Sequence, residues 1–371
     1  MFTGMLVTVT FIVSLALEPL LSVTVSVRVS VVPTVSGLAE FLDNNKFEIY
    51  ALKKSQGEIN INYLKNQCQL FTYNKKLGFT KLWNYIQALY YCDILYLPKR
   101  ENLTAILFFN KFFQKKLFLT IEGIIDNYVV DKLEKKKKNG FQRFLNLTNQ
   151  VENIYSITKY MKEYNETKVG LKSKSTILYL GVNNQQFTPK AKISNKLKNI
   201  IFIGNDMKRK GIHEYIKLAE IYPSLTFHIV GEGNSINIEA ISNQYPNINY
   251  HGVLPPSKLN KLLQTIDLHI LPSKSEGFPK VILETASVGI PSMLYGTYGA
   301  SEWIKSDENG FIIENFQEFQ IKINELNNID QLLYKNAINA LKLADNFNWS
   351  NIVNIWETEI VTIVNDKGDN T

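Results

Sequence analysis

The stretch Leu271-Pro-Ser-Lys-Ser-Glu-Gly-Phe-Pro-Lys-Val-Ile-Leu-Glu284 predicts a strand, a loop and a helix in succession. Its beginning belongs to the run Asp267-Leu-His-Ile-Leu-Pro272, which is short and apolar, as in a buried strand. Gly277 and Pro279 indicate the turn that follows. A helix is predicted to begin near Pro279, because proline has no N–H group to leave unpaired at a first helical position. Such a strand-loop-helix junction is typical of α/β proteins.

The junction carries two carboxylates, with Glu276 in the loop and Glu284 about one and a half turns into the predicted helix. The unpaired N–H groups of a first helical turn attract phosphate. Carboxylates accept hydrogen bonds from vicinal hydroxyls, so one could bind a hexose and the other a ribose. On this interpretation the junction binds a nucleotide-sugar. Spacing alone leaves a second interpretation open, in which Glu276 caps the helix and Glu284 lies on a solvated face.

Strand-like and helix-like segments alternate along both halves of the chain. The segments of the first half are a helix end and strand at 38–52, a helix at 82–91 and strands at 93–97, 116–121 and 176–180. Those of the second half are strands at 199–203, 225–230, 248–253 and 268–271 and a helix at 212–221. Between the halves, residues 183–198 are polar and aperiodic, which indicates a linker. This order predicts an α/β fold of two doubly wound, Rossmann-like domains that face each other across a ligand cleft.

The composition is that of an ordinary globular protein. The chain has 371 residues, of which 45% are apolar and 20% charged, and this length suits two domains. Two cysteines, Cys68 and Cys92, form neither a metal-binding pattern nor a disulfide framework, so a reducing compartment is expected. The four histidines are scattered, and His228 and His269 are predicted to pack within strands. We therefore expect no protein-bound metal.

Basic residues are concentrated in the first half. Residues 1–185 contain 24 Lys and Arg against 14 Asp and Glu, whereas residues 186–371 contain 17 against 20. The relevant positions are Lys132–Lys138, together with Lys111, Lys115 and Lys116 beside Phe112, Phe113, Leu117 and Phe118. They predict contact with an anionic membrane or a lipid-phosphate acceptor, and a solvated face is the alternative. Nucleic acid is not an expected partner, since no recognised binding module accompanies the charge.

The N-terminus combines an apolar stretch with a strand-like one. Residues 5–17 are apolar but too few to span a bilayer, and no Lys or Arg precedes them as in a secretory signal. Residues 23–31 alternate valine with polar residues and predict the first strand of a sheet, preceded by an extension. An uncleaved membrane anchor is the alternative. The expected location is cytoplasmic, with a possible peripheral position on the inner face of the cell membrane.

Several short segments of the second half form an ordered series. They are Gly181-Val-Asn183 with Phe187 and Pro189, Phe202-Ile-Gly204 through Lys210-Gly211, Ile229-Val-Gly-Glu-Gly233, His251-Gly-Val253, Glu276 to Glu284, Tyr298-Gly-Ala-Ser-Glu302 and Asn309-Gly310. In this order they resemble the GT-B glycosyltransferases of family 4, whose signature is Glu-x7-Glu. An ordered series over about 170 residues is hard to obtain by chance, which favours the donor-site interpretation of the two glutamates. In the first half the similarity is mainly confined to residues 38–52 and 120–123.

The resemblance implies that the chain is divided into three parts. Residues 1–183 would form an acceptor-side domain, residues 184–345 a domain for the nucleotide-sugar donor, and residues 346–371 a helix that crosses back to the first domain, with a tail. It implies a retaining glycosyltransferase that moves a sugar from a nucleoside diphosphate to a saccharide or lipid-linked acceptor, without an obligatory metal or other cofactor. A role in surface polysaccharide assembly, as of lipopolysaccharide or capsule, is expected by analogy.

The resemblance also implies roles for individual residues. Lys210 would neutralise the donor diphosphate, Glu276 would hold the transferred sugar and the phosphate, Glu284 would bind the ribose hydroxyls, and Val253 would flank the base. The other expected donor contacts are Gly204, Asn205, Arg209, Gly277, Phe278, Pro279 and Lys280. A cation and helix N–H groups that stabilise the charge developing on the leaving diphosphate can supply much of the catalysis.

Three departures from the family pattern accompany these roles. Asn205 stands where the family usually has arginine, so Lys208 or Arg209 would have to substitute. Glu122, which we place among the catalytic residues, stands where a histidine is common. Residues 18–22 replace the usual glycine-rich loop. These departures keep two alternatives open, a catalytically silent nucleotide-sugar-binding module and a sugar-nucleotide epimerase of the same fold.

Overall fold

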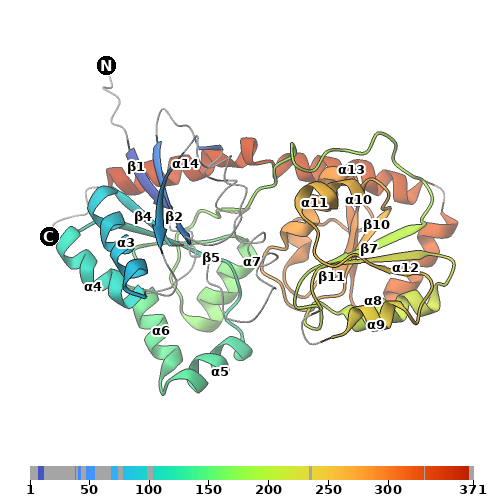
Figure 1. The fold of residues 1–371 in the computed structure, drawn as a ribbon, viewed down its shortest axis with the longest axis horizontal. Coiled ribbons are helices and arrows are strands. Elements are labelled where there is room, and N and C mark those ends of the chain that lie inside the picture. Colours follow the sequence, from blue (N-terminus) through green and yellow to red (C-terminus); the bar gives the residue numbers. More distant parts are fainter. Residues whose placement is uncertain are drawn as a thin grey trace. The chain divides into compact units, whose positions relative to one another are not determined.

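A computed structural model describes residues 7–11, 38, 41–42, 47–54, 68–73, 78–97, 103–233, 236–329 and 331–366 (Figure 1). The described residues fall into two compact units. The first unit contains those before Leu180 and those after Asn351, and the second unit contains Leu180–Asn351. Each unit has its own parallel sheet with helices around it.

The sheet described for the first unit has six strands in the spatial order β3-β2-β1-β4-β5-β6. The strands are β1 (Val7–Phe11), β2 (Phe47–Lys54), β3 (Cys68–Tyr73), β4 (Ile94–Leu97), β5 (Lys116–Ile121) and β6 (Asn153–Ser156). The helices are α3 (Gly78–Tyr91), α4 (Leu103–Phe113), α5 (Asn127–Lys136), α6 (Gly140–Thr148), α7 (Lys159–Tyr164), a π-helical turn (Asn165–Val169) and α14 (Trp349–Asn365). All strand pairings are parallel. The strand order reverses at β1, as in the predicted doubly wound sheet.

The first strand begins earlier than predicted. Strand β1 (Val7–Phe11) lies inside the apolar stretch 5–17, where alternating valine and threonine favour extended backbone. It pairs with β2 and β4. The strand predicted at 23–31 and the loop at 18–22 lie outside the described residues. Among the residues that the structure describes, no helix is long and apolar enough to cross a membrane.

The segment 176–180 forms a single β-bridge instead of the predicted strand. The bridge joins Ile177 to Ser156 at the end of β6. Beyond it, the carbonyl oxygen of Tyr179 accepts a hydrogen bond from Nε1 of Trp356 at 3.0 Å. The indole of Trp356 therefore pairs with a carbonyl group that a longer β-ladder would have paired with a neighbouring strand.

Strands β4 and β5 form the centre of the first core. All four side chains of β4 are buried, and so are those of residues 117–121 in β5. A strand inside a parallel sheet is covered on both faces and is therefore apolar throughout. This burial corrects one prediction, because Leu117 and Phe118 belong to the core and cannot contact a membrane.

Helix α14 returns to the first unit, as predicted for the last helix. Its Trp356 packs 6.0 Å, between ring centroids, from both Tyr96 and Phe118. The carboxylate of Glu359 accepts hydrogen bonds from the hydroxyl of Tyr155 at 2.7 Å and from that of Thr176 at 2.6 Å. The helix thus completes the core of the first unit by contacts with residues far away in the sequence.

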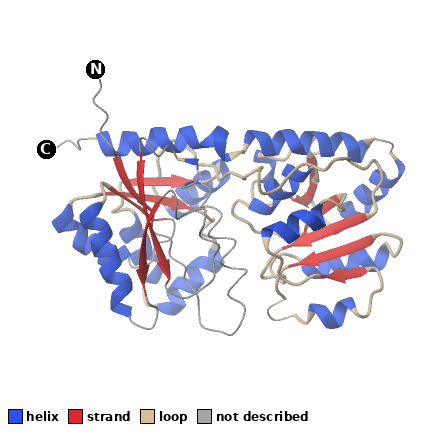
Figure 2. Ribbon diagram, turned by 45° about the horizontal axis from the view of Figure 1, so that its top comes forward, coloured by secondary structure: helices blue, strands red, loops and turns tan. Residues whose placement is uncertain are grey.

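The sheet described for the second unit also has six strands, in the order β12-β11-β10-β7-β8-β9. Figure 2 draws strands in red and helices in blue. The strands are β7 (Asn199–Ile203), β8 (Thr226–Val230), β9 (Ile248–Tyr250), β10 (Leu268–Leu271), β11 (Ser292–Tyr295) and β12 (Gly310–Ile313). The helices are α8 (Ile212–Ile221), α9 (Ile238–Ser242), α10 (Pro256–Leu263), α11 (Lys280–Val288), α12 (Phe316–Asn328), α13 (Leu332–Asn346) and a 3₁₀ turn (Ala300–Glu302). The strand order reverses between β7 and β10, which is the switch point of this sheet.

Three predicted boundaries shift in the second unit. Strand β8 begins at Thr226, one residue later than predicted. Strand β9 ends at Tyr250 because Gly252 turns the chain with a φ of 61°. Helix α11 begins at Lys280, and Pro279 is its N-cap instead of its first residue. Strands β7 and β10 and helix α8 have the predicted bounds.

Candidate functional site

The loops that follow β7 and β10 lie next to each other at the switch point. Gly211, with a φ of 83°, allows this approach, because a Cβ atom there would lie 2.1 Å from the carbonyl oxygen of Pro272. A Cβ atom at Gly204 would lie 2.3 Å from Cδ of Lys210, so the lysine side chain crosses over this glycine. Ligands of doubly wound sheets bind outside the carboxyl ends of the strands at such a point.

Glu276, Lys210 and Arg209 form a charged cluster where these loops meet. Nζ of Lys210 donates to Oε1 of Glu276 at 2.8 Å, and Nη1 of Arg209 donates to the same oxygen at 3.2 Å. The side chain of Glu276 is 8% exposed and that of Lys210 is 14% exposed. A buried carboxylate costs free energy unless it is paired and hydrogen-bonded, and the two cations supply that pairing. The structure thus brings three of the predicted site residues together.

The cluster keeps Glu276 ionised. Burial raises the pKa of this carboxyl, but the charges of Lys210 and Arg209 and the hydrogen bonds of Lys210 and Ser273 outweigh burial and lower the pKa below its usual value. Two positive groups therefore face one oxygen of Glu276, and Arg209 also pairs with Asp206. Cations that converge on one oxygen can also bind an oxygen of an anionic ligand.

Arg209 is held in position by its surroundings. Its Nε donates to Oδ2 of Asp206 at 3.1 Å, and its Nη1 also donates to the carbonyl oxygen of Ser275. Lys208 is exposed. Of the two residues that the sequence offered in place of the family's arginine, Arg209 is the one that contacts Glu276.

Asn205 joins the loops that follow β7 and β8. Its amide oxygen accepts the N–H group of Glu232 at 3.1 Å. A Cβ atom at Gly231 would lie 2.2 Å from the carbonyl oxygen of Gly204 and 3.2 Å from this amide oxygen. Asn205 therefore positions a loop, and its direct contact with the donor stays a prediction.

Helix α11 begins directly after the loop that carries Glu276. No side chain in the described part of the chain caps this helix, so its first turn offers backbone N–H groups to an anion. Phe278 anchors the loop, since its ring packs 5.0 Å from that of Trp303 and 5.7 Å from that of Phe347. The predicted donor contacts Gly277 and Pro279 flank Phe278 in this loop.

Glu284 lies one turn into α11 and is half-buried. Burial raises its pKa, and the positive charge of Lys280 offsets only part of this effect. The two glutamates of the signature thus have opposite environments, because cations hold Glu276 ionised while burial makes Glu284 easier to protonate. A carboxyl on this turn has the chemistry to bind vicinal hydroxyls.

The segment after β9 is tied to strand β8. The N–H group of His251 donates to the carbonyl oxygen of Ile229 at 2.9 Å, and that of Gly231 donates to the carbonyl oxygen of Gly252 at 2.8 Å. Val253 follows and is exposed. An exposed apolar side chain on a fixed segment suits contact with the flat face of a base, which stays a prediction.

Glu122 belongs to the first unit, where it follows β5 and is exposed. Burial and the charge of Glu122 raise the pKa of Tyr96, whose hydroxyl lies 2.8 Å from that of Thr120. The cluster around Glu276 belongs to the second unit. The catalytic role of Glu122 therefore stays a prediction.

Tyr298 is a site residue that the sequence reasoning did not identify. It is buried, and its hydroxyl has no hydrogen-bond partner among the described residues. Burial and the charge of Glu276 raise the pKa of this hydroxyl. Buried polar groups normally find a partner, either protein, water or ligand. The only signal in the sequence was the position of Tyr298 at the start of the segment 298–302.

His269 makes the second unit sensitive to acid. Its buried Nδ1 lies 2.9 Å from Oγ of Ser292, and burial and the charge of Lys210 lower its pKa to about 3. Below about pH 6 the unfolded chain therefore binds more protons than the folded one, and the unfolding free energy falls by up to about 1.4 kcal/mol per pH unit. We expect His269→Gln to flatten the decline between about pH 6 and about pH 4 in urea unfolding.

The matched control for this prediction is His213→Gln, which replaces an exposed imidazole on α8. Its decline in stability is expected to follow that of the wild type. A His269→Gln profile parallel to the wild-type profile would contradict the role given to His269.

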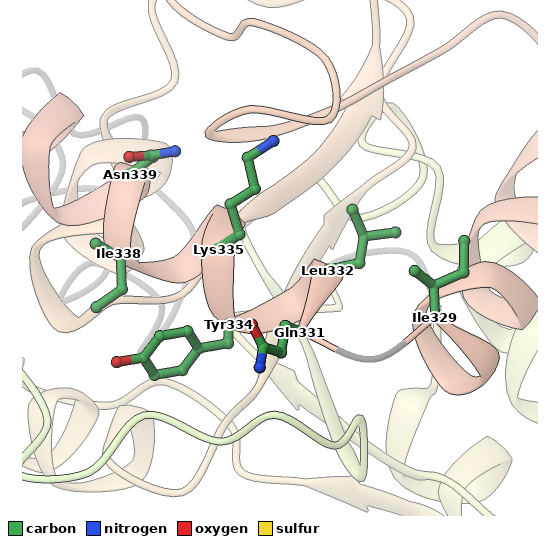
Figure 3. A pocket seen from close by; sticks show the side chains of 7 residues that line it. All are labelled: Ile329, Gln331, Leu332, Tyr334, Lys335, Ile338 and Asn339. Atoms are coloured by element: carbon green, nitrogen blue, oxygen red, sulfur yellow. The ribbon is translucent and has the colours of Figure 1, made fainter.

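A separate pocket of about 500 Å³ lies between the end of α12 and the start of α13 (Figure 3). It is lined by Ile329, Gln331, Leu332, Tyr334, Lys335, Ile338 and Asn339. Among the lining residues that the structure describes, Lys335 is the single charged one, and none of them is a predicted site residue. The described lining contains none of the residues predicted to bind a nucleotide-sugar, and we assign the pocket no role.

Known proteins share both sequence and fold with this chain. Residues 183–344 match the family described as Glycosyl transferases group 1. The chain is 32% identical over 123 residues to alpha-galactosylglucosyldiacylglycerol synthase of Streptococcus pneumoniae, which is 31% of this chain and 30% of that protein. It is 29% identical over 210 residues to the capsular polysaccharide biosynthesis glycosyltransferase CapM of Staphylococcus aureus. These residues make up 50% of this chain and 54% of CapM. The match thus spans 30% of one of these relatives and 54% of the other.

The solved structures agree on the fold. The crystal structure of HepE from Anabaena in complex with UDP and glucose superposes with a TM-score of 0.72 at 16% identity, covering 96% of this chain and 100% of that one. Two Rossmann-like units with the same strand order, together with this likeness, define the fold as the GT-B fold. Residues 183–344 are a Glycosyl transferases group 1 domain.

Proposed function

We propose that the protein transfers a sugar from a nucleoside-diphosphate donor to a saccharide or lipid-linked acceptor. The observation that carries this proposal is the buried Glu276, whose Oε1 is shared by Lys210 and Arg209 directly before the first turn of α11. A carboxylate, two cations and a helix N-terminus are the groups that a sugar diphosphate requires.

The donor diphosphate is proposed to lie against Lys210, Arg209 and the start of α11. Transfer breaks the bond between the anomeric carbon and a diphosphate oxygen, so negative charge develops on the leaving diphosphate. Fixed cations and N–H groups in a site partly shielded from water stabilise this charge without rearranging. We propose that these groups suffice without a metal, and that the reaction needs no cofactor besides the donor.

The rest of the donor is proposed to contact the neighbouring groups. Glu276 would bind hydroxyls of the transferred sugar, Glu284 those of the ribose, and Val253 the base. Retention of the anomeric configuration is proposed from the resemblance to the family.

The acceptor is proposed to be a glycan or a lipid-linked glycan. One relative is named for a galactosylglucosyldiacylglycerol and another for capsular polysaccharide, and both names support a role in glycan biosynthesis. Residues 135–138 at the end of α5 are four exposed lysines. We propose that they attract the phosphate of a lipid acceptor or of a membrane surface.

A screen of nucleotide-sugars by thermal shift tests the proposal, because a ligand that binds only the folded state raises the melting temperature. The best donor is then incubated with and without acceptor mixtures, and the anomeric configuration of the product is read by NMR. Transfer supports the proposal. Binding without turnover would indicate the silent module, and conversion of the donor sugar without acceptor would indicate the epimerase.

Removal of divalent metal is expected to leave the rate unchanged, since we propose that Lys210 and Arg209 neutralise the diphosphate in place of a metal. Initial rates are compared in excess EDTA and in Mg²⁺ or Mn²⁺. Loss of transfer in EDTA that returns with added metal would refute the metal-independent proposal while leaving donor binding intact.

A further inference from the structure

The loop that carries Glu276 has a neighbouring loop on each side. We define it as the β10 loop, residues 272–279, which joins β10 to α11. Strand β10 lies between β11 and β7 in the sheet of the second unit and is parallel to both. Because the carboxyl ends of parallel strands meet at one edge of a sheet, the loops after β7 and β11 flank the β10 loop.

On the β7 side, the β10 loop is held by groups that we propose to bind the donor. Nη1 of Arg209 donates to the carbonyl oxygen of Ser275. Arg209 and Lys210 also donate to Oε1 of Glu276, at 3.2 Å and 2.8 Å. A diphosphate that binds to these two cations competes with the loop for them. The β10 loop is therefore expected to lose part of its hydrogen bonding on this side when the donor binds.

On the β11 side, the β10 loop is held by a residue that has no proposed contact with the donor. Oγ1 of Thr297, two residues beyond the end of β11, donates to the carbonyl oxygen of Lys274 at 2.7 Å. Within the loop, Oγ of Ser273 donates to the carbonyl oxygen of Ser275 at 3.1 Å. The two peptide carbonyls directly before Glu276 thus both accept hydrogen bonds. The bond from Thr297 does not depend on either cation.

The side chain of Lys274 contributes less to this contact than its backbone carbonyl. Its Nζ lies 3.8 Å from Oε1 of Glu214 and 5.7 Å from the ring centroid of Tyr295. The side chain is 73% exposed, and an exposed ion pair adds little to stability. The hydrogen bond from Thr297 to the carbonyl group is therefore the specific link between the β10 loop and the segment after β11.

We propose that Thr297 is a positioning residue, whose hydroxyl keeps the β10 loop and Glu276 in place while the donor is bound. The inference rests on the proposed function, because it concerns the loop that we place at the sugar and the diphosphate. Groups that stabilise developing charge are effective only when they are already in position. Thr297 is exposed, so water can replace its hydroxyl in the free protein, and a small effect on the melting temperature is expected.

Replacing Thr297 with valine tests the effect on transfer, since valine keeps the shape of the side chain without the hydroxyl. The kcat of Thr297→Val is expected to fall by about 3- to 10-fold, and more than KM rises, whereas Thr297→Ser restores it. The matched control is Thr265→Val, which removes an exposed hydroxyl that donates to the carbonyl oxygen of Leu262 at 2.8 Å in the same unit. This control is expected to transfer sugar as the wild type does. Equal kcat of the wild type and Thr297→Val overturns the proposal.

Limited digestion with trypsin tests the same contact without a donor. Trypsin cleaves after an exposed lysine when the surrounding chain opens locally, and Thr297 binds the carbonyl group of the bond that follows Lys274. The fragment that ends at Lys274, identified by mass spectrometry, is expected to form about 3- to 10-fold faster from Thr297→Val. Thr297→Ser and Thr265→Val are expected to release it at the wild-type rate.

The two measurements together separate the possible outcomes. An unchanged rate of cleavage after Lys274 in Thr297→Val overturns the proposal, because the loop is then held without the hydroxyl. Faster cleavage with unchanged kcat shows a contact that is only structural, which also overturns it. A wild type that transfers no sugar refutes the proposed function instead, and the cleavage rates still decide whether Thr297 holds the β10 loop.

Discussion

Replacing Lys210 with alanine is expected to slow sugar transfer by about 10²- to 10³-fold at saturating donor. The substitution removes the cation that we place at the leaving diphosphate. It also leaves Glu276, which is largely buried, with Arg209 as its remaining cationic contact. A charge aimed at the leaving group acts mainly on the transition state, so kcat is expected to fall more than KM rises. Initial rates over a range of donor concentrations measure both.

Two further substitutions serve as controls for Lys210. Lys210→Arg keeps the charge but changes its shape, and it is expected to retain part of the activity. Asn205→Ala is expected to cost less than Lys210→Ala, because Asn205 holds the loop after β8 through the N–H group of Glu232. Equal activity of the wild type and Lys210→Ala would remove Lys210 from the mechanism. A matching melting temperature shows that any loss is not caused by unfolding.

Replacing Glu284 with alanine is expected to weaken nucleotide-sugar binding by about 10- to 100-fold. A charged hydrogen bond to a ribose hydroxyl is worth about 1.5–3 kcal/mol, which corresponds to that range. Isothermal titration calorimetry with the best donor from the thermal-shift screen measures the affinity. The matched control is Glu308→Ala, which removes an exposed glutamate of the same unit. Unchanged affinity of Glu284→Ala would contradict the ribose role.

The pH dependence of binding separates Glu284 from Glu276. Burial raises the pKa of Glu284, so acidification protonates it at a higher pH than an ordinary glutamate. Donor affinity is then expected to fall as pH decreases through that range, since the protonated carboxyl is the weaker acceptor. Glu284→Gln is expected to remove this fall in donor affinity, because an amide does not titrate in that pH range. Glu276 stays ionised over the same range, because its pKa is lowered.

Much of the second unit could be predicted from the sequence because its signals are local. Strand β10 and helix α11 follow from an apolar run, a glycine and a proline within residues 267–289. The pairing of Glu276 with Arg209 could not be predicted, because which basic side chain reaches the carboxylate depends on the φ and ψ angles of the loop. Asp206 in this loop, for example, has a positive φ of 52°, which its sequence does not reveal.

In the first unit the pattern of apolar and basic residues did not distinguish buried from exposed side chains. Phe118 and Phe112 both lie in aromatic and basic sequence, but Phe118 is in a central strand and Phe112 is on the outer side of a helix. The two could be separated only by knowing which faces the neighbouring strands and α14 cover. Similarly, residues 7–11 and residues 23–31 both alternate valine with other residues, so the sequence favours a strand in each. Only the pairing with β2 and β4 identifies residues 7–11 as β1.

The shared oxygen of Glu276 occupies a position that a phosphate oxygen of the proposed donor could take. The carboxylate holds the ammonium of Lys210 and the guanidinium of Arg209 toward one point, as a phosphate oxygen would. Both cations are therefore already oriented before a donor arrives, and little side-chain entropy remains to be lost on binding. An incoming diphosphate has to compete with that carboxylate for the same two donors. We therefore expect the carboxylate of Glu276 to weaken donor binding while it keeps the two cations in place.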